Sequence, residues 1–271
     1  MCILSFNNYS INLDYPINPT PRFGWEKPVH KKIYDIINNN RSIYHKNMEL
    51  CLKSMSYLKQ ISSLPDPQDP TQPCWHNSYM TDLDAISLYV FTREMNPTNY
   101  YEIGSGHSTT FVKRAITDHK LKTKITAIDP SPRTKIDTIC DKLIVDHLEN
   151  IDLSMFEQLQ KGDILFFDGS HRSFTNSDVT IFFLEIMPLL RPGVLVGIHD
   201  IFLPHDYPAG WNFRFYNEQY LLATALLANG NQFEIIFPAM FIRLDTELSQ
   251  AFDLVWNHTS EGSGCFWLRM N

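Results

Sequence analysis

The segment Tyr100–Thr109 reads YYEIGSGHST and carries a short apolar run into a turn that contains two glycines. Gly104 and Gly106 let the backbone turn tightly and approach a ligand closely, because glycine has no Cβ. Ser108 is well placed to cap a following helix, whose free N–H groups would attract an anionic ligand group. The segment therefore predicts a strand, a ligand-binding turn and a helix.

Helices and short apolar strands alternate from Leu83 to the C-terminus. Helices are predicted at 82–95, 108–119, 153–160, 177–190 and 214–229, and strands at 99–104, 124–129, 142–146, 163–168, 193–200, 233–238 and 265–270. Such alternation implies right-handed crossovers and a mainly parallel sheet that helices cover on both faces. We expect an α/β, Rossmann-like, doubly wound fold.

Residues 1–80 do not show this alternation of helices and strands and are predicted to form a separate N-terminal part. Helical spacing of apolar residues appears at 29–40 and 47–61, and the linker at 63–73 contains four prolines. We expect an N-terminal helical appendage with a Pro-rich linker at 1–80 and the main domain at 81–271. The appendage would cover a cofactor, build an acceptor pocket or form a homodimer, and the sequence leaves these three roles open.

Composition limits the possible partners. The 271 residues carry a formal net charge of -7, which argues against a surface that follows nucleic-acid phosphates. The start MCILSF is too short for a signal peptide, and no apolar run reaches the roughly 18 residues of a membrane span. We expect a cytoplasmic protein with no nucleic-acid or membrane partner. Its cysteines are scattered and are expected to be reduced thiols: Cys2, Cys51, Cys74, Cys140 and Cys265.

Acidic and imidazole side chains follow the predicted strands. In a parallel sheet the carboxyl ends of the strands meet at one edge, where ligands bind. The first five strands all end at or beside an acid. The residues at these ends are Glu102, Asp129, Asp146, His147, Asp168, His171, His199 and Asp200. This edge is therefore the predicted active site.

The glycine turn favours one class of cofactor. A dinucleotide fingerprint would carry a third glycine where Thr109 stands. Glu102 would repel a pyrophosphate but suits an ammonium group, and Asp129, at the end of the second strand, suits a ribose diol. A ligand with an amino-acid end and a nucleoside end is S-adenosylmethionine. The predicted cofactor-binding residues are Glu102, Gly104, Ser105, Gly106, Ser108, Asp129 and Asp168.

From about Leu83 onward the chain resembles a class I S-adenosylmethionine-dependent methyltransferase, of the small-molecule or sugar O-methyltransferase subgroup. The first motif of that family is similar to YYEIGSGHST, its second to AID at 127–129 and its fourth to DILFFDGSH at 163–171. GVLVGIHD resembles the fifth strand of the subgroup, and CFWLRM resembles an antiparallel last strand. The resemblance implies a seven-stranded sheet. One departure is Ser108, where the family commonly has a third glycine.

The end of the fourth strand favours oxygen as the methyl acceptor. Relatives that methylate amino or amide nitrogen often have Asn or Asp, two prolines and an aromatic residue there, whereas this chain has DGSH. Asp168 and His171 offer an acid and an imidazole, and a histidine can take a hydroxyl proton at neutral pH. The predicted catalytic residues are His171 as the proton acceptor, Asp168, and His199 as the next candidate base.

A divalent ion is a further expectation, because some relatives with acids at strands four and five bind one. Asp168, His199 and Asp200 would suit Mg²⁺ or Mn²⁺. The predicted reaction is O-methylation of a small hydroxylated molecule, such as a sugar or glycosylated metabolite. Two alternatives stay open: a metal-dependent hydroxylase-like enzyme on the same fold, and a non-catalytic cofactor-binding module.

Overall fold

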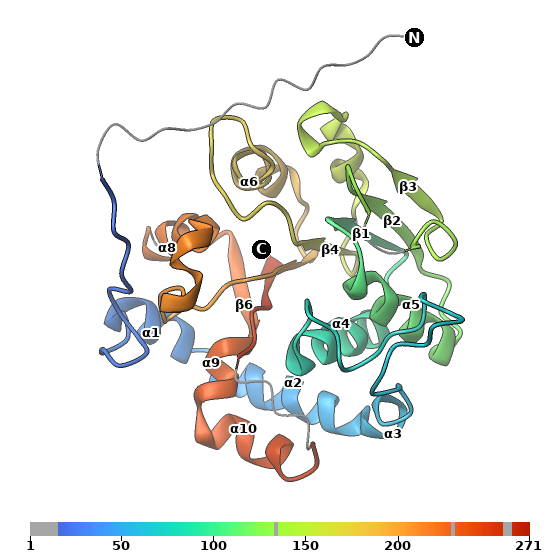
Figure 1. Cartoon of the computed structure of the whole chain (residues 1–271), viewed down its shortest axis with the longest axis horizontal. Helices are drawn as coiled ribbons and strands as arrows, with labels where there is room; N and C mark the ends of the chain where they lie inside the picture. The colour runs from blue at the N-terminus through green and yellow to red at the C-terminus, as the bar shows by residue number, and fades with distance from the viewer. Residues whose placement is uncertain (1–15, 133–134, 229–230, 257–261) are drawn as a thin grey trace.

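The computed structural model describes residues 16–132, 135–228, 231–256 and 262–271, and their strands form one seven-stranded sheet (Figure 1). The strands are β1 (Asn99–Ile103), β2 (Lys124–Ile128), β3 (Lys142–Ile144), β4 (Ile164–Phe167), β5 (Leu195–Ile198), β6 (Phe233–Pro238) and β7 (Phe266–Met270). They lie in the order β3-β2-β1-β4-β5-β7-β6. Only β7 runs antiparallel to its neighbours, so the predicted doubly wound sheet with an antiparallel last strand is confirmed for the described residues.

Helices cover both faces of this sheet, with α4 and α5 on one face and α6 on the other (Figure 1). The α-helices are α1 (Lys31–Asn38), α2 (Arg41–Lys53), α3 (Met55–Leu58), α4 (Asp82–Met95), α5 (His107–His119), α6 (Asp178–Ile181), α7 (Met187–Leu189), α8 (Glu218–Leu227), α9 (Ala239–Leu244) and α10 (Thr246–Asp253). The 3-10 helices are η1 (Leu148–Asn150), η2 (Leu153–Gln158) and η4 (Ala209–Arg214), and η3 (Phe182–Ile186) is a π-helix.

Several predicted elements differ from the observed ones. The helix predicted at 153–160 is the 3-10 helix η2. The one predicted at 177–190 changes to π geometry before Pro188, because a proline removes one backbone N–H and crowds the preceding turn. The helix expected from Arg214 begins at Glu218, because Phe215 adopts a left-handed conformation. Finally, α9 and α10 were not predicted.

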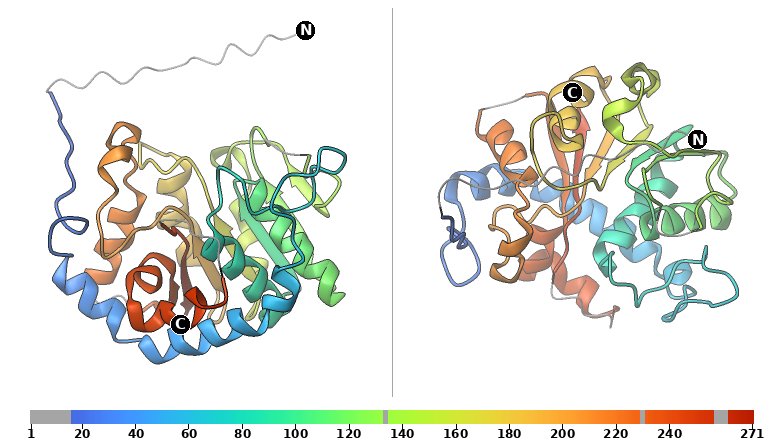
Figure 2. Two further views of the ribbon diagram at one scale, coloured as in Figure 1. Left: turned by 60° about the horizontal axis from the view of Figure 1, so that its bottom comes forward. Right: turned by 45° about the horizontal axis from the view of Figure 1, so that its top comes forward.

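The N-terminal helices lie along one side of the molecule and share the core of the sheet (Figure 2). Ile37 and Tyr44 are fully buried in the same apolar cluster as Phe166 of β4 and Trp267 of β7. Helix α2 packs against β6, α4 and α10. Residues 31–58 thus form an additional helical layer on the domain, while the boundary at residues 80 and 81 stays a prediction.

Two further expectations from the sequence concern membrane-spanning helices and the state of the cysteines. None of the helices within the described residues combines the length and the apolar character that crossing a membrane requires. Cys51, Cys74, Cys140 and Cys265 are free thiols, three of them buried, as expected. Cys2 and the MCILSF start lie outside the described residues.

Candidate functional site

A large cleft opens at the carboxyl ends of the parallel strands. Its volume is about 1530 Å³, above the roughly 300–1,000 Å³ of a pocket for one small ligand. Its lining includes Gly104 after β1, Asp129 after β2, Asp168 and His171 after β4, and Asp200 after β5. The predicted edge of the sheet therefore holds one cleft with room for a cofactor and an acceptor together.

The turn after β1 has the close backbone approach that its glycines predict. Gly104 has a φ of +78°, and a Cβ on it would lie 1.9 Å from the carbonyl oxygen of Asp168. Its N–H donates to the carbonyl of Ile128 at 2.8 Å. The turn is thus wedged between the ends of β2 and β4, and a side chain at position 104 would disrupt it.

Asp129 holds the glycine turn from the end of β2. Its Oδ2 accepts hydrogen bonds from the backbone N–H and the hydroxyl of Ser105, both at 2.8 Å, and its Oδ1 accepts from the N–H of Ser131 at 2.7 Å. Ser105 and Asp129 both line the cleft. The structure therefore brings these two predicted cofactor residues together and gives Asp129 a second task, which is to fix the turn.

Glu102 lies outside the set of residues that line the cleft and is fully buried. It accepts hydrogen bonds from the hydroxyl of Thr109 at 2.5 Å and from that of Tyr100 at 3.3 Å, and it also bonds Ser108. Burial raises the pKa of this carboxyl to about 8, and nearby Asp168 adds to the effect. Its contacts support the glycine turn from behind, and its binding of an ammonium group stays a prediction.

The predicted cap at Ser108 is wrong. Helix α5 begins at His107 and its N-cap is Gly106, whose N–H donates to the hydroxyl of Thr109 at 3.1 Å. Ser108 is buried in the first turn and bonds Glu102. Thr109, which occupies the position of a dinucleotide fingerprint's third glycine, therefore performs part of the capping that was assigned to Ser108.

Two histidines and three carboxylates meet where β4 and β5 end. His199 Nδ1 lies 3.3 Å from Asp168 Oδ1 and 3.5 Å from Asp200 Oδ1. His171 Nε2 lies 3.4 Å from both Asp168 Oδ1 and Asp200 Oδ2, while its Nδ1 lies 2.5 Å from Glu218 Oε1. All of the predicted catalytic and metal-binding residues thus form one cluster, as their strand-end positions indicated.

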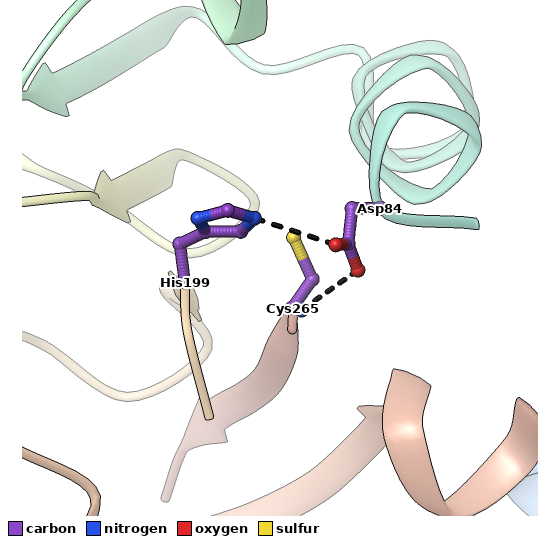
Figure 3. Close-up of side chains that lie close together, drawn as sticks. All are labelled: Asp84, His199 and Cys265. Carbon is purple, nitrogen blue, oxygen red and sulfur yellow. Dashed lines mark hydrogen bonds and ion pairs between the residues drawn. The ribbon is translucent and has the colours of Figure 1, made fainter. Parts of the chain in front are cut away.

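Glu218 and Asp84 belong to this cluster, although neither was among the predicted catalytic or metal-binding residues. Glu218 is fully buried at the start of α8, and burial raises its pKa to about 7 despite the attraction of His171. Asp84 is fully buried in α4, and its Oδ2 lies 3.3 Å from His199 Nε2 (Figure 3). An acid inside the otherwise apolar pattern DLDAISLYVF was the available signal for Asp84.

The electrostatics of the two histidines are dominated by these acids. Burial alone would lower the pKa of His171, but Glu218, Asp200 and Asp168 outweigh it and raise the pKa to about 9. Burial likewise opposes the proton on His199, yet Asp168 and Asp200 hold its pKa well above the usual value. These acids therefore favour the protonated form of both imidazoles.

Asp168, His199 and Asp200 fit a divalent ion. Their three ligand atoms lie within 4.8 Å of one another, and buried His199 Nδ1 has no well-oriented hydrogen bond among the described residues. Two carboxylate oxygens and one imidazole suit Mg²⁺ or Mn²⁺. A deprotonated imidazole could supply a ligand there.

A second set of potential ligands, Asp84, His199 and Cys265, fits an ion less well (Figure 3). Both oxygens of Asp84 already accept hydrogen bonds from the N–H of Gly264, and one of them also accepts from that of Cys265. Burial holds the pKa of the Cys265 thiol well above its usual value. Since a metal binds the thiolate, this cysteine is a poor ligand.

The match with known proteins falls on the same part of the chain. Residues 101–201, from β1 to just beyond β5, match a family model described as a methyltransferase domain. Residues 101–201 are thus similar to a methyltransferase domain. This range contains the glycine turn, Asp129, Asp168, His171, His199 and Asp200. No curated protein matches the sequence.

Solved structures of low identity also align with this chain. The Podospora anserina methyltransferase PaMTH1, bound to S-adenosylhomocysteine, is 17% identical, with 92% of this chain and 100% of that chain covered and a TM-score of 0.46. The O-methyltransferase from Bacillus cereus, also in complex with S-adenosylhomocysteine, is 13% identical, with 89% and 95% covered and a TM-score of 0.41. TomG from Streptomyces achromogenes, an O-methyltransferase, is 16% identical, with 68% and 77% covered and a TM-score of 0.39.

Proposed function

We propose that the protein transfers the methyl group of S-adenosylmethionine to a hydroxyl oxygen of a small molecule, such as a sugar or glycosylated metabolite. The observation that carries this proposal is the cluster of Asp168, His199 and Asp200 with His171, in the cleft that also contains the glycine turn. A hydroxyl must lose its proton as the carbon–oxygen bond forms, whereas the sulfonium supplies a methyl group that needs no acid catalysis. Acids and imidazoles beside the donor meet that requirement.

Asp168, His199 and Asp200 would hold a divalent ion in this proposal. Such an ion polarises the acceptor hydroxyl and makes its proton easier to remove. The remaining chemistry belongs to the side chains of the cleft. The glycine turn and Asp129 hold the methyl donor, and Asp168 lies at the junction between the donor and the cluster, because its backbone packs against Gly104.

We propose His171 as the group that accepts the proton. Buried Glu218 fixes its Nδ1, so Nε2 is the nitrogen that faces Asp168 and Asp200 in the cleft. A cation held by Asp168 and Asp200 would weaken their attraction for a protonated His171, so that Nε2 would be able to accept a proton. Glu218 then stabilises the imidazolium that forms, in the way that a buried acid supports a catalytic histidine.

The test uses the full-length protein with S-adenosylmethionine labelled on its methyl group and a metabolite extract as the source of acceptor. We expect labelled product whose methyl group is on oxygen, no product with excess chelator, and recovery with Mg²⁺ or Mn²⁺. Product on nitrogen would overturn the choice of oxygen. Full activity in excess chelator would overturn the proposed requirement for a divalent ion. Tight iron binding without methyl transfer would favour a hydroxylase-like enzyme. Cofactor binding with no product from any extract would favour a non-catalytic module.

A further inference from the structure

Two arginines line the same cleft without a carboxylate partner. Arg172 follows His171, and Arg214 ends η4. Among residues 16–132, 135–228, 231–256 and 262–271, no Asp or Glu lies within the 4.0 Å of an ion pair from either guanidinium. The protein has a formal net charge of -7, so acids are plentiful elsewhere on it. Neither guanidinium therefore has an ion pair within the described part of the chain.

Aromatic rings and neutral oxygen atoms hold both guanidiniums in place. The Cζ of Arg214 lies 4.1 Å from the centroid of the Trp211 ring, and its Nη1 donates to the hydroxyl of Tyr216 at 3.3 Å. The Cζ of Arg172 lies 5.1 Å from the centroid of the Tyr216 ring, and its Nε donates to the carbonyl of Arg214 at 2.8 Å. These contacts order the side chains without neutralising them, and each guanidinium keeps N–H groups for a ligand.

Tyr216 connects the arginines to the reacting centre. Its ring lies against the imidazole of His171, with centroids 4.4 Å apart and an interplanar angle of 31°. Arg172 and Arg214 both lie near the same Tyr216 ring. Both arginines and the imidazole of His171 therefore contact one ring, that of Tyr216, in the same cleft.

We infer that Arg172 and Arg214 bind an anionic group, a carboxylate or a phosphate, on the hydroxylated acceptor. The inference rests on the proposed function, because it places the acceptor between His171 and this wall. A guanidinium matches the geometry of both anions, and the half-buried rings of Trp211 and Tyr216, which line the cleft, suit contact with a sugar or phenyl ring. The acceptor is thus an acidic hydroxylated ring compound such as a uronic acid, a hydroxybenzoate or a sugar phosphate.

The rival explanation is that the arginines bind the carboxylate of the methyl donor. The affinity for S-adenosylhomocysteine separates the two. If the acceptor inference is correct, Arg172→Gln and Arg214→Gln keep wild-type affinity for S-adenosylhomocysteine, measured by calorimetry. A large loss of that affinity in either variant would assign the pair to the cofactor and overturn the inference.

The decisive experiment measures binding of matched anionic and neutral probes by calorimetry, with saturating S-adenosylhomocysteine and with chelator to prevent metal-mediated binding. The pairs are D-glucuronate with D-glucuronamide, 3-hydroxybenzoate with 3-hydroxybenzamide, and glucose 6-phosphate with glucose. We expect at least one anion to bind about 10- to 100-fold more tightly than its neutral partner, and less tightly as salt increases. The carboxylate and phosphate pairs show which anion the site prefers.

Variants then assign that preference to the arginines. Arg172→Gln and Arg214→Gln should each remove most of the preference for the anion, whereas Arg191→Gln, at an exposed arginine that bonds Gln160 outside the cleft, should keep it. Thermal unfolding of each variant checks that the protein is folded. Equal binding of anion and neutral partner, no anion binding in the wild type, or an unchanged preference in the double variant would each overturn the inference.

The same inference can fail while the proposed function stands. Labelled product from a metabolite extract should be retained by an anion exchanger after its release from the protein. A labelled O-methyl product that passes through the exchanger would overturn the acidic acceptor and leave O-methylation intact. A product that is methylated on nitrogen but retained by the exchanger would overturn O-methylation and leave the acidic acceptor intact.

Discussion

Asp84 fixes which nitrogen of His199 faces the acid cluster. Asp84 Oδ2 lies 3.3 Å from His199 Nε2 (Figure 3). His199 Nδ1 lies 3.3 Å from Asp168 Oδ1 and 3.5 Å from Asp200 Oδ1. Burial opposes the charge on Asp84, but hydrogen bonds from His199, Gly264 and Cys265 keep its pKa below the usual value. An ionised Asp84 can only accept, so Nε2 of His199 keeps its proton and Nδ1 is the nitrogen available to a metal.

Asp84→Asn should therefore weaken metal binding although Asp84 is no ligand in the proposed site. Loss of such a supporting carboxylate typically costs about 10- to 100-fold in metal affinity. Titration of the protein with Mn²⁺, followed by electron paramagnetic resonance, measures this without any assay of activity. Asp146→Asn removes an exposed acid of the same cleft and should leave the affinity unchanged. Equal Mn²⁺ affinity in Asp84→Asn and the wild type would show that Asp84 serves folding alone.

The part of the site that the sequence predicted consists of residues at strand ends. Asp168, His199 and Asp200 follow β4 and β5, which pair in parallel, so the register of the sheet brings these side chains together. Asp84 and Glu218 reach the same cluster from helices α4 and α8. Their positions depend on how the helices pack on the sheet, and no spacing in the sequence encodes that packing.

Glu102 differs from the other strand-end residues in where its side chain lies. It lies on a strand that was predicted correctly, one residue before the end of β1, but its side chain is buried behind the turn instead of lining the cleft. The hydroxyls of Tyr100, Ser108 and Thr109 surround it there. Which face of the strand its carboxyl occupies follows from the register with β2 and β4, which the motif alone does not contain.

A second prediction concerns Asp129 and the binding of cofactor. Asp129→Ala should greatly reduce the affinity for S-adenosylhomocysteine in calorimetry, because the variant loses the proposed ribose contact and releases Ser105 and Ser131. Ser105→Ala is the matched control, since it removes one hydrogen bond to Asp129 and keeps the carboxylate. A modest loss in Ser105→Ala beside a large loss in Asp129→Ala supports direct binding. Unchanged affinity in Asp129→Ala would remove the ribose assignment.

The buried carboxyl of Glu102 predicts a dependence of stability on pH. Burial raises its pKa from 4.5 to about 8, so the folded state favours the protonated acid. This contribution is complete below the lower value and is lost as the pH rises to the upper one, at up to about 1.4 kcal/mol per pH unit. Urea unfolding across this window should show a flatter profile for Glu102→Gln than for the wild type. Glu149→Gln, at an exposed position, should follow the wild-type profile. Parallel profiles for Glu102→Gln and the wild type would mean that Glu102 is charged in the folded protein.

The final prediction tests His171 as the proton acceptor. His171 adopts a φ of +63° just beyond β4, and Glu218 at 2.5 Å and Tyr216 at 4.4 Å between ring centroids fix its imidazole. This fixed ring presents Nε2 to the cluster in the cleft. A positioned base contributes about 100- to 10,000-fold in rate, so His171→Ala should lower kcat by that order with nearly unchanged affinity for S-adenosylhomocysteine.

His171→Gln separates proton transfer from hydrogen bonding at the same position. Its amide keeps part of the hydrogen bonding to Glu218 but cannot carry the proton, so kcat should stay as low as in His171→Ala. His147→Ala removes an exposed imidazole from the same cleft and should keep the wild-type kcat, which controls for the general loss of a histidine. The measurement is single-turnover methyl transfer, because it reports the chemical step even where product release limits turnover. If either His171 variant reacts at a rate near that of the wild type, another group removes the proton. His199, whose Nδ1 faces Asp168 and Asp200 in the same cluster, would then be the next candidate base.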